Sequence, residues 1–197
     1  MKKTLFIGAL FCISLVSVNA AVVFSGTNGD LDFNAPSGSF TLGEITVTLA
    51  ANSGSVVNAT ASGGLGVNSP TGVDDSDGLD TLIMGVNETL TFSFDVDVTL
   101  NSISYANAGD NDGLALSFNG VVGPDLAPNT FGEVIYDTVL LAGETLVITA
   151  TAPNGPDEQN NGVSITQFTV TAIPEPSSVA LIGLAGIAAI FRRRKLV

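Results

Sequence analysis

The chain has 197 residues, a formal net charge of −13 and 45% hydrophobic residues. All 6 basic residues lie near its two ends, and residues 21–172 contain every acidic residue except Glu175 but no Lys, Arg, His or Cys. Phosphate binding needs cationic side chains, so nucleic acid is excluded as a partner of residues 21–172. Neither disulfides nor salt bridges between side chains can stabilise this body.

The first 20 residues have the three parts of a secretory signal peptide. Lys2 and Lys3 precede an apolar run over residues 5–16, and the small-residue phrase Val18-Asn19-Ala20 follows it. This order predicts export and cleavage by signal peptidase after Ala20. The apolar run is too short to cross a bilayer comfortably, which disfavours a retained anchor.

The remaining body, residues 21–172, has the length of one domain and the patterning of β-strands. Residues 90–98 alternate strictly between apolar and polar side chains, which predicts a strand with one buried face. Residues 40–42 and 45–49 alternate in opposite phase, so Gly43-Glu44 is a bulge or a tight turn. Less regular runs of Val, Ile, Thr and Phe predict further strands at 102–106, 114–118, 134–141, 145–150 and 163–172.

Clusters of Gly, Asn, Asp, Ser and Pro separate these runs, and no part of the body has a sustained helical period. Many short strands joined by such turns are typical of sandwiches and jelly rolls. The sequence therefore predicts an all-β fold: a single antiparallel β-sandwich or jelly-roll-like domain. A signal peptide and a C-terminal hydrophobic sorting helix flank it.

Three glutamates each follow a turn residue and precede a predicted strand: Glu44, Glu88 and Glu144. We interpret the three phrases as tight turns that leave the glutamate in contact with water. A shared metal site is the alternative.

The missing residue types restrict the chemistry of the body. Without His, Cys, Lys or Arg it has no Ser–His–Asp site, no Cys–His pair, no Schiff-base lysine and no soft ligand for zinc. Carboxylate chemistry remains, but no aspartic-protease phrase is present and no particular pair of carboxylates is indicated. We therefore expect that the protein is not an enzyme.

Hard cations are the better match for a body rich in carboxylates. The densest acidic segment is a candidate Ca²⁺ loop with the potential ligands Asp74, Asp75, Asp77 and Asp80. Residues 110–113 form a second, smaller candidate. Neither segment fits an EF-hand, because apolar residues would occupy ligand positions. The alternative is that both are solvated turns.

The C-terminus joins three features: Pro174-Glu175-Pro176, an apolar run over residues 179–191, and the basic cluster Arg192-Arg193-Arg194-Lys195. The prolines prevent a helix from continuing upstream, so we expect a helix to begin near Ser177. The apolar run would be about 20 Å long as a helix, which makes it a marginal span of a hydrocarbon core about 30 Å thick. The cations would hold this end in the cytoplasm and leave the body outside.

This combination resembles the PEP-CTERM sorting signal of Gram-negative bacteria. The resemblance covers residues 173–197. It implies that the tail anchors the protein in the inner membrane, that an exosortase then cuts near Pro174-Glu175-Pro176, and that the body reaches the cell surface or the extracellular polymer. An ordinary C-terminal anchor is the alternative.

These features predict an exported surface or extracellular-matrix protein with a structural or adhesive role in association with exopolysaccharide. Divalent cations would link its carboxylates to an anionic exopolysaccharide or another cell-surface polymer. The alternative is a Ca²⁺-dependent carbohydrate-binding module. Against that alternative, the body has no Trp and only Tyr105 and Tyr136 as tyrosines.

Overall fold

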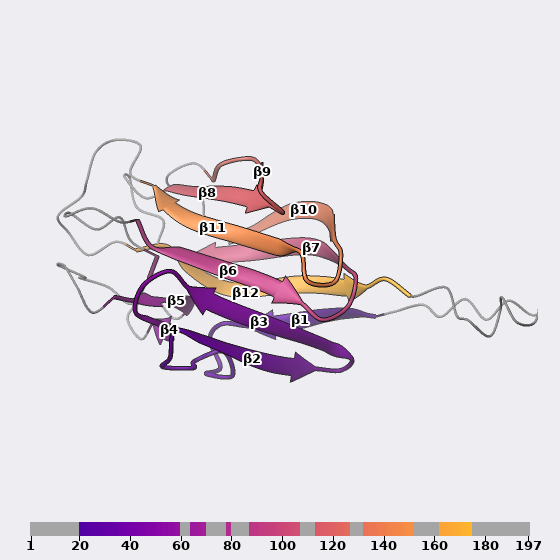
Figure 1. The fold of residues 1–197 in the computed structure, drawn as a ribbon, viewed down its shortest axis with the longest axis horizontal. Helices are drawn as coiled ribbons and strands as arrows, with labels where there is room; N and C mark the ends of the chain where they lie inside the picture. The colour runs from indigo at the N-terminus through magenta and orange to yellow at the C-terminus, as the bar shows by residue number, and fades with distance from the viewer. Residues whose placement is uncertain are drawn as a thin grey trace, which may run out of the picture.

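The computed structural model describes residues 20–59, 64–69, 78–79, 87–106, 113–126, 132–151 and 162–174. Within these ranges all regular structure is β-strand, in two antiparallel sheets that pack face to face (Figure 1). The predicted all-β class and sandwich-like architecture are confirmed.

Each sheet contains six strands. Sheet A has the order β10 (Gly132–Leu140), β7 (Val98–Ala106), β12 (Ser164–Ala172), β5 (Gly64–Asn68) and β4 (Ser55–Ala59), and β1 (Ala21–Ser25) also pairs with β12. Sheet B has the order β2 (Ser37–Leu42), β3 (Ile45–Ala51), β6 (Thr89–Phe94), β11 (Thr145–Thr151), β8 (Gly113–Phe118) and β9 (Val121–Val122).

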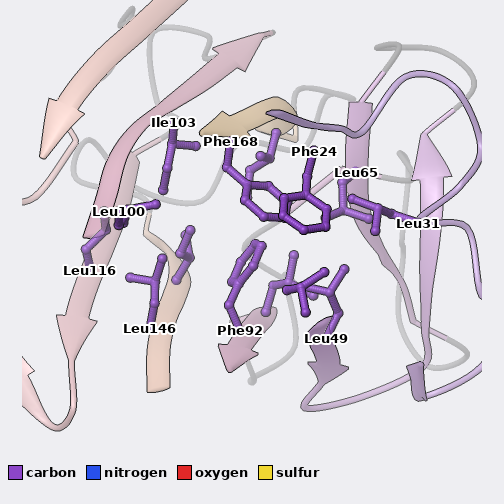
Figure 2. Close-up of a cluster of buried hydrophobic side chains, with 14 of the residues drawn as sticks. Phe24, Leu31, Leu49, Leu65, Phe92, Leu100, Ile103, Leu116, Leu146 and Phe168 are labelled. Carbon is purple, nitrogen blue, oxygen red and sulfur yellow. The ribbon is translucent and has the colours of Figure 1, made fainter. Parts of the chain in front are cut away.

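The core fills the space between the sheets because their strands alternate between inward apolar and outward polar residues. Phe168 of β12 lies near its centre (Figure 2). Its ring stacks on Phe24 at 4.8 Å and meets the ring of Phe92 edge-on at 5.3 Å, so aromatic contacts join β1, β12 and β6 across the sandwich. Both geometries are favourable arrangements for aromatic rings.

Of the two forms predicted for Gly43-Glu44, the structure shows the tight turn. β2 and β3 pair in register up to Leu42 and Ile45, which leaves Gly43-Glu44 as a tight turn rather than a bulge. The predicted strand over 90–98 is wrong beyond Phe94, where β6 ends and the chain crosses to sheet A. Alternation continues there, and the Asp95 N–H still donates to the Thr46 carbonyl at 3.1 Å. The Thr46 N–H, however, donates to the Asp95 carboxylate at 2.7 Å, so a side-chain bond takes the place of one bond of the strand ladder.

Strands β1, β4, β5 and β9 were not expected from the sequence. β5 contains Gly64 and Gly66, which favour turns when read in isolation. In the sheet, however, Gly64 lies so close to β12 that a Cβ atom would stand 2.7 Å from the Cβ of Ser164. Glycine is therefore required at this position because β5 and β12 pack too closely for a side chain.

Candidate functional site

One end of the sandwich, which we call the turn end, gathers the short turns between strands. β6 ends beside the beginnings of β3 and β11, and β7 begins beside the ends of β10 and β12. This register places four carboxylates in turns at the same end, namely Glu44, Asp95, Asp97 and Glu144.

Both termini of the sandwich also lie at the turn end (Figure 1). Ala21 opens β1 and pairs with Thr171 near the end of β12, and the exposed Ala20 directly precedes that strand. Beyond β12, the Ile173 N–H donates to the Asp97 carbonyl at 2.8 Å, and Pro174 is exposed. The predicted cleavage position thus directly precedes β1, and the first residue of the predicted sorting signal lies two residues beyond the end of β12.

Three of the four turn-end carboxylates, those of Asp95, Asp97 and Glu144, accept backbone N–H groups. Asp97 Oδ1 accepts the Ala142 N–H at 2.8 Å. Glu144 Oε2 accepts the Leu141 N–H at 2.9 Å, while its Oε1 accepts a bond from the Asn119 amide at 2.8 Å. These bonds shape the turns and leave the charges near water. In the part of the chain that the structure describes, no group of three or more acidic, His or Cys side chains is placed to hold a metal ion.

The opposite end, which we call the far end, is where β3, β7 and β11 stop and β6, β10 and β12 begin. Here the Glu88 side chain is 0% exposed. Ser69 Oγ donates to Glu88 Oε1 at 2.6 Å, and the hydroxyls of Ser69 and Ser53 lie 2.8 Å apart. A buried carboxylate is tolerable only with such partners.

The expectation that all three glutamates contact water is correct for Glu44, which is exposed, and wrong for Glu88. Asn52 explains the difference. Its amide donates to the Asn87 carbonyl at 2.9 Å and its oxygen accepts the Thr89 N–H at 2.9 Å, which fixes the chain on both sides of Glu88. The sequence did contain a signal, since residue 88 continues the inward series 90, 92 and 94.

Toward the far end, the buried Tyr105 of β7 contacts the half-buried Tyr136 of β10, a pair that sequence reasoning did not place. The hydroxyls of Tyr105 and Tyr136 share a hydrogen bond of 2.7 Å, and Tyr105 is only 2% exposed. Burial raises the pKa of Tyr105 far above its ordinary value, and the neighbouring Tyr136 raises it further. Burial also raises the pKa of Tyr136. Tyr105 is therefore not accessible to stack on a sugar ring.

Several predicted site residues lie outside the described ranges. They are the candidate calcium ligands Asp74, Asp75, Asp77 and Asp80, the aspartates of the second candidate segment, and the sorting-signal residues Glu175, Pro176, Arg192, Arg193, Arg194 and Lys195. The structure does describe the flanks of the first candidate loop. The Val67 N–H donates to the Gly78 carbonyl at 3.0 Å, and Leu79 bridges to Val163.

A family model of the PEP-CTERM protein-sorting motif matches residues 172–195. This match confirms the sorting tail predicted from the sequence. The motif marks an exported protein that an exosortase processes and that its tail anchors in the membrane beforehand. No curated protein and no solved structure matches the chain. Among the described residues, no helix has the length and apolar character needed to cross a membrane.

Proposed function

We propose that the protein is a non-catalytic structural component of the cell surface or extracellular polymer matrix, freed from the membrane when an exosortase removes its tail. One observation carries the proposal: the sorting motif begins at Ala172, the last residue of β12 in an acidic β-sandwich. The lack of His, Cys, Lys and Arg in residues 21–172 supports a role without catalysis.

The position of the termini suits two successive cuts. Signal peptidase acting after Ala20 would free the first residue of β1, which is paired with β12. Exosortase acting near Pro174-Glu175-Pro176 would cut just beyond the Ile173 N–H bond to Asp97. Both cuts fall outside the paired strands, so the β1–β12 pairing is retained in the released domain.

Adhesion would follow from charge. Exposed carboxylates occur along the described chain, among them Asp30, Asp32, Asp125, Glu133 and Asp137. Ca²⁺ or Mg²⁺ would bridge such groups to an anionic exopolysaccharide and relieve the repulsion between them. Asp74, Asp75, Asp77 and Asp80 are the residues proposed to hold Ca²⁺ most closely.

Fractionation of producer cells with intact-mass measurement tests the placement. We expect a form outside the cytoplasm that lacks residues 1–20 and 179–197. In a strain without exosortase, the same measurement should find the tail present and the protein in the membrane. A released protein whose mass still includes residues 179–197 contradicts processing by an exosortase.

Retention on alginate that is covalently coupled to agarose beads, which EDTA does not dissolve, tests the adhesive mechanism separately. The released protein should bind in millimolar Ca²⁺ and elute in EDTA. Binding that persists in EDTA contradicts cation bridging but leaves the sorting proposal intact.

A further inference from the structure

Exposed apolar side chains gather at the turn end. Seven large hydrophobic side chains are exposed in the described part of the chain, and four of these lie in or beside turns at this end, namely Leu42, Val121, Val122 and Leu141. They occupy different edges of the sandwich, since β2 and β9 are the two edge strands of sheet B and β10, which Leu141 follows, is an edge strand of sheet A. The turn end thus has an apolar rim, which we define by these four residues.

The most exposed part of this rim is held in place by hydrogen bonds. Val121 and Val122 are 71% and 80% exposed and follow the two-residue turn Asn119-Gly120, whose φ angles of +48° and +79° are those of a tight hairpin turn. The Asn119 N–H donates to the Thr145 carbonyl at 2.7 Å, which fixes the turn against β11. Little conformational freedom is therefore left to lose when the two valines meet a partner.

The chain leaves the sandwich for its membrane tail at this same end (Figure 1). Pro174 is exposed, and only four residues separate it from the apolar run over residues 179–191. Even fully extended, this link spans at most about 18 Å, of which the headgroup layer takes about 6 Å. The apolar run is also shorter than the hydrocarbon core is thick, which draws its flanking residues toward the membrane. While the tail is anchored, the turn end is therefore the part of the domain that faces the lipid.

We infer that the turn end docks on the membrane surface as long as the tail is attached, with the apolar rim entering the boundary between headgroups and acyl chains. Apolar side chains gain free energy when they leave water for this region. Even a myristoyl chain alone binds a membrane only marginally, so four side chains cannot hold the free domain there. The tether makes their contact intramolecular and so raises their effective concentration. Removal of the tail therefore ends the docking, and the domain leaves the membrane.

The carboxylates of the turn end restrict the lipid that fits. Asp95, Asp97 and Glu144 lie among the same turns as the rim, and residues 21–172 contain no cationic side chain that could offset them. Anionic headgroups would repel these charges, whereas zwitterionic headgroups would not. The inferred partner is therefore a zwitterionic lipid surface, and the docking should weaken as the share of anionic lipid rises.

A fluorophore on a single cysteine tests the docking, because residues 21–197 contain no Cys. The tail-bearing membrane form from a strain without exosortase is placed in phosphatidylcholine vesicles that carry a nitroxide quencher at headgroup depth. A label at Val122→Cys should be quenched. A label at Ile135→Cys is the control and should not be quenched, since Ile135 is also exposed, at 62%, but lies about 20 Å from Leu141 along β10. The Val122→Cys label on the form that the producer releases should not be quenched either.

A second comparison separates docking from tethering alone. With the label at Leu42→Cys, the double change Val121→Thr with Val122→Thr should lower the quenching by about half, because two side chains of the rim become polar while side-chain shape and strand propensity are kept. Ile135→Thr, the matched control, should leave the quenching unchanged. Anionic phosphatidylglycerol added to the vesicles at low salt should lower it as well.

Three outcomes overturn the inference. They are equal quenching at Val122 and Ile135, quenching at Leu42 that the threonine changes do not alter, and shielding of the Val122 label in the released form without lipid, which would assign the rim to contact with a second copy of this chain. None of the three contradicts the proposed function, which mass measurement and fractionation test. Conversely, a tail that is never removed contradicts that function and leaves the docking intact.

Discussion

At the turn end, Asp95 and Glu144 accept backbone N–H groups while their charges remain near water, whereas at the far end Glu88 is withdrawn from water and bonded to Ser69. The same residue type is thus used in two ways in one small domain. The turn end requires only local turn geometry, which suits the place where the chain enters and leaves the fold. The far end depends on buried polar networks, so substitutions there should lower the free energy of unfolding more than substitutions at the turn end.

The largest expected effect compares Glu88→Ala with Glu44→Ala. Removal of Glu88 leaves a cavity and takes one hydrogen-bond acceptor from buried Ser69, so we expect a loss of about 3 kcal/mol in the free energy of unfolding. Glu44 is exposed, and its removal should change stability by less than about 0.5 kcal/mol. Urea unfolding followed by circular dichroism measures both.

Ser69→Ala separates the two causes of that loss. It keeps the Glu88 side chain but removes the hydrogen bond that Ser69 donates to it, and we expect a loss of about 1 to 3 kcal/mol in the free energy of unfolding. Similar costs for Glu44→Ala and Glu88→Ala would remove the contrast between the two ends.

This contrast also shows what the sequence could predict. The alternation of β6 and the phase change around Gly43 predicted strands, their faces and a turn or bulge between two of them, because period-two patterning follows from burial of one sheet face. Alternation alone could not show that Asp95 ends β6, since Thr46 lies far away in the sequence. Nor could it identify β5, whose Gly64 is explained only by the approach of β12.

Of the candidate sites, the sorting tail was predictable because its recognition depends on a contiguous motif. The buried position of Glu88 depends on Asn52 and Ser69, which come from other parts of the chain. The tyrosine pair likewise joins β7 and β10. Such networks become visible only when strand pairing is known.

Calcium should stabilise the fold through the candidate loop and not through the carboxylates of the turn end. If Asp74, Asp75, Asp77 and Asp80 bind Ca²⁺ with the millimolar to submillimolar affinity of extracellular modules, 10 mM Ca²⁺ should stabilise the fold by about 2 kcal/mol. Asp75→Asn with Asp77→Asn should abolish that gain. Asp95→Asn with Asp97→Asn, a change of equal charge and spacing at the turn end, should preserve it. Calorimetry with and without Ca²⁺ measures the shift in Tm, and an unchanged wild-type Tm rules out the proposed calcium loop.

Alkaline pH should weaken the far end. The pKa of Tyr105 is raised in the folded state above its ordinary value of 10.0, so the unfolded chain releases this proton first. The stabilising contribution is therefore complete below pH 10 and declines above it, by about 1.4 kcal/mol for each pH unit. Urea unfolding at pH 9, 10 and 11 measures the decline.

Few other side chains titrate in this alkaline range, because residues 21–172 contain no Lys, Arg or Cys and the chain has only 2 tyrosines. A variant with Tyr105→Phe and Tyr136→Phe should lose most of the pH dependence. A slope that persists in this variant would assign the decline to a group outside the pair.

The smallest expected effect is at the turn end, where Gly143 has a φ of +80°. A Cβ atom there would meet no atom within 4 Å, so Gly143→Ala should cost only the backbone strain of the left-handed region, about 1 kcal/mol. Gly143→Asn should cost less, since Asn adopts this conformation more readily. Thermal unfolding of both variants measures the difference. A loss for Gly143→Ala as large as that for Glu88→Ala would show that the turn end is as tightly constrained as the far end, and would remove the reason to regard it as the tolerant side of the domain.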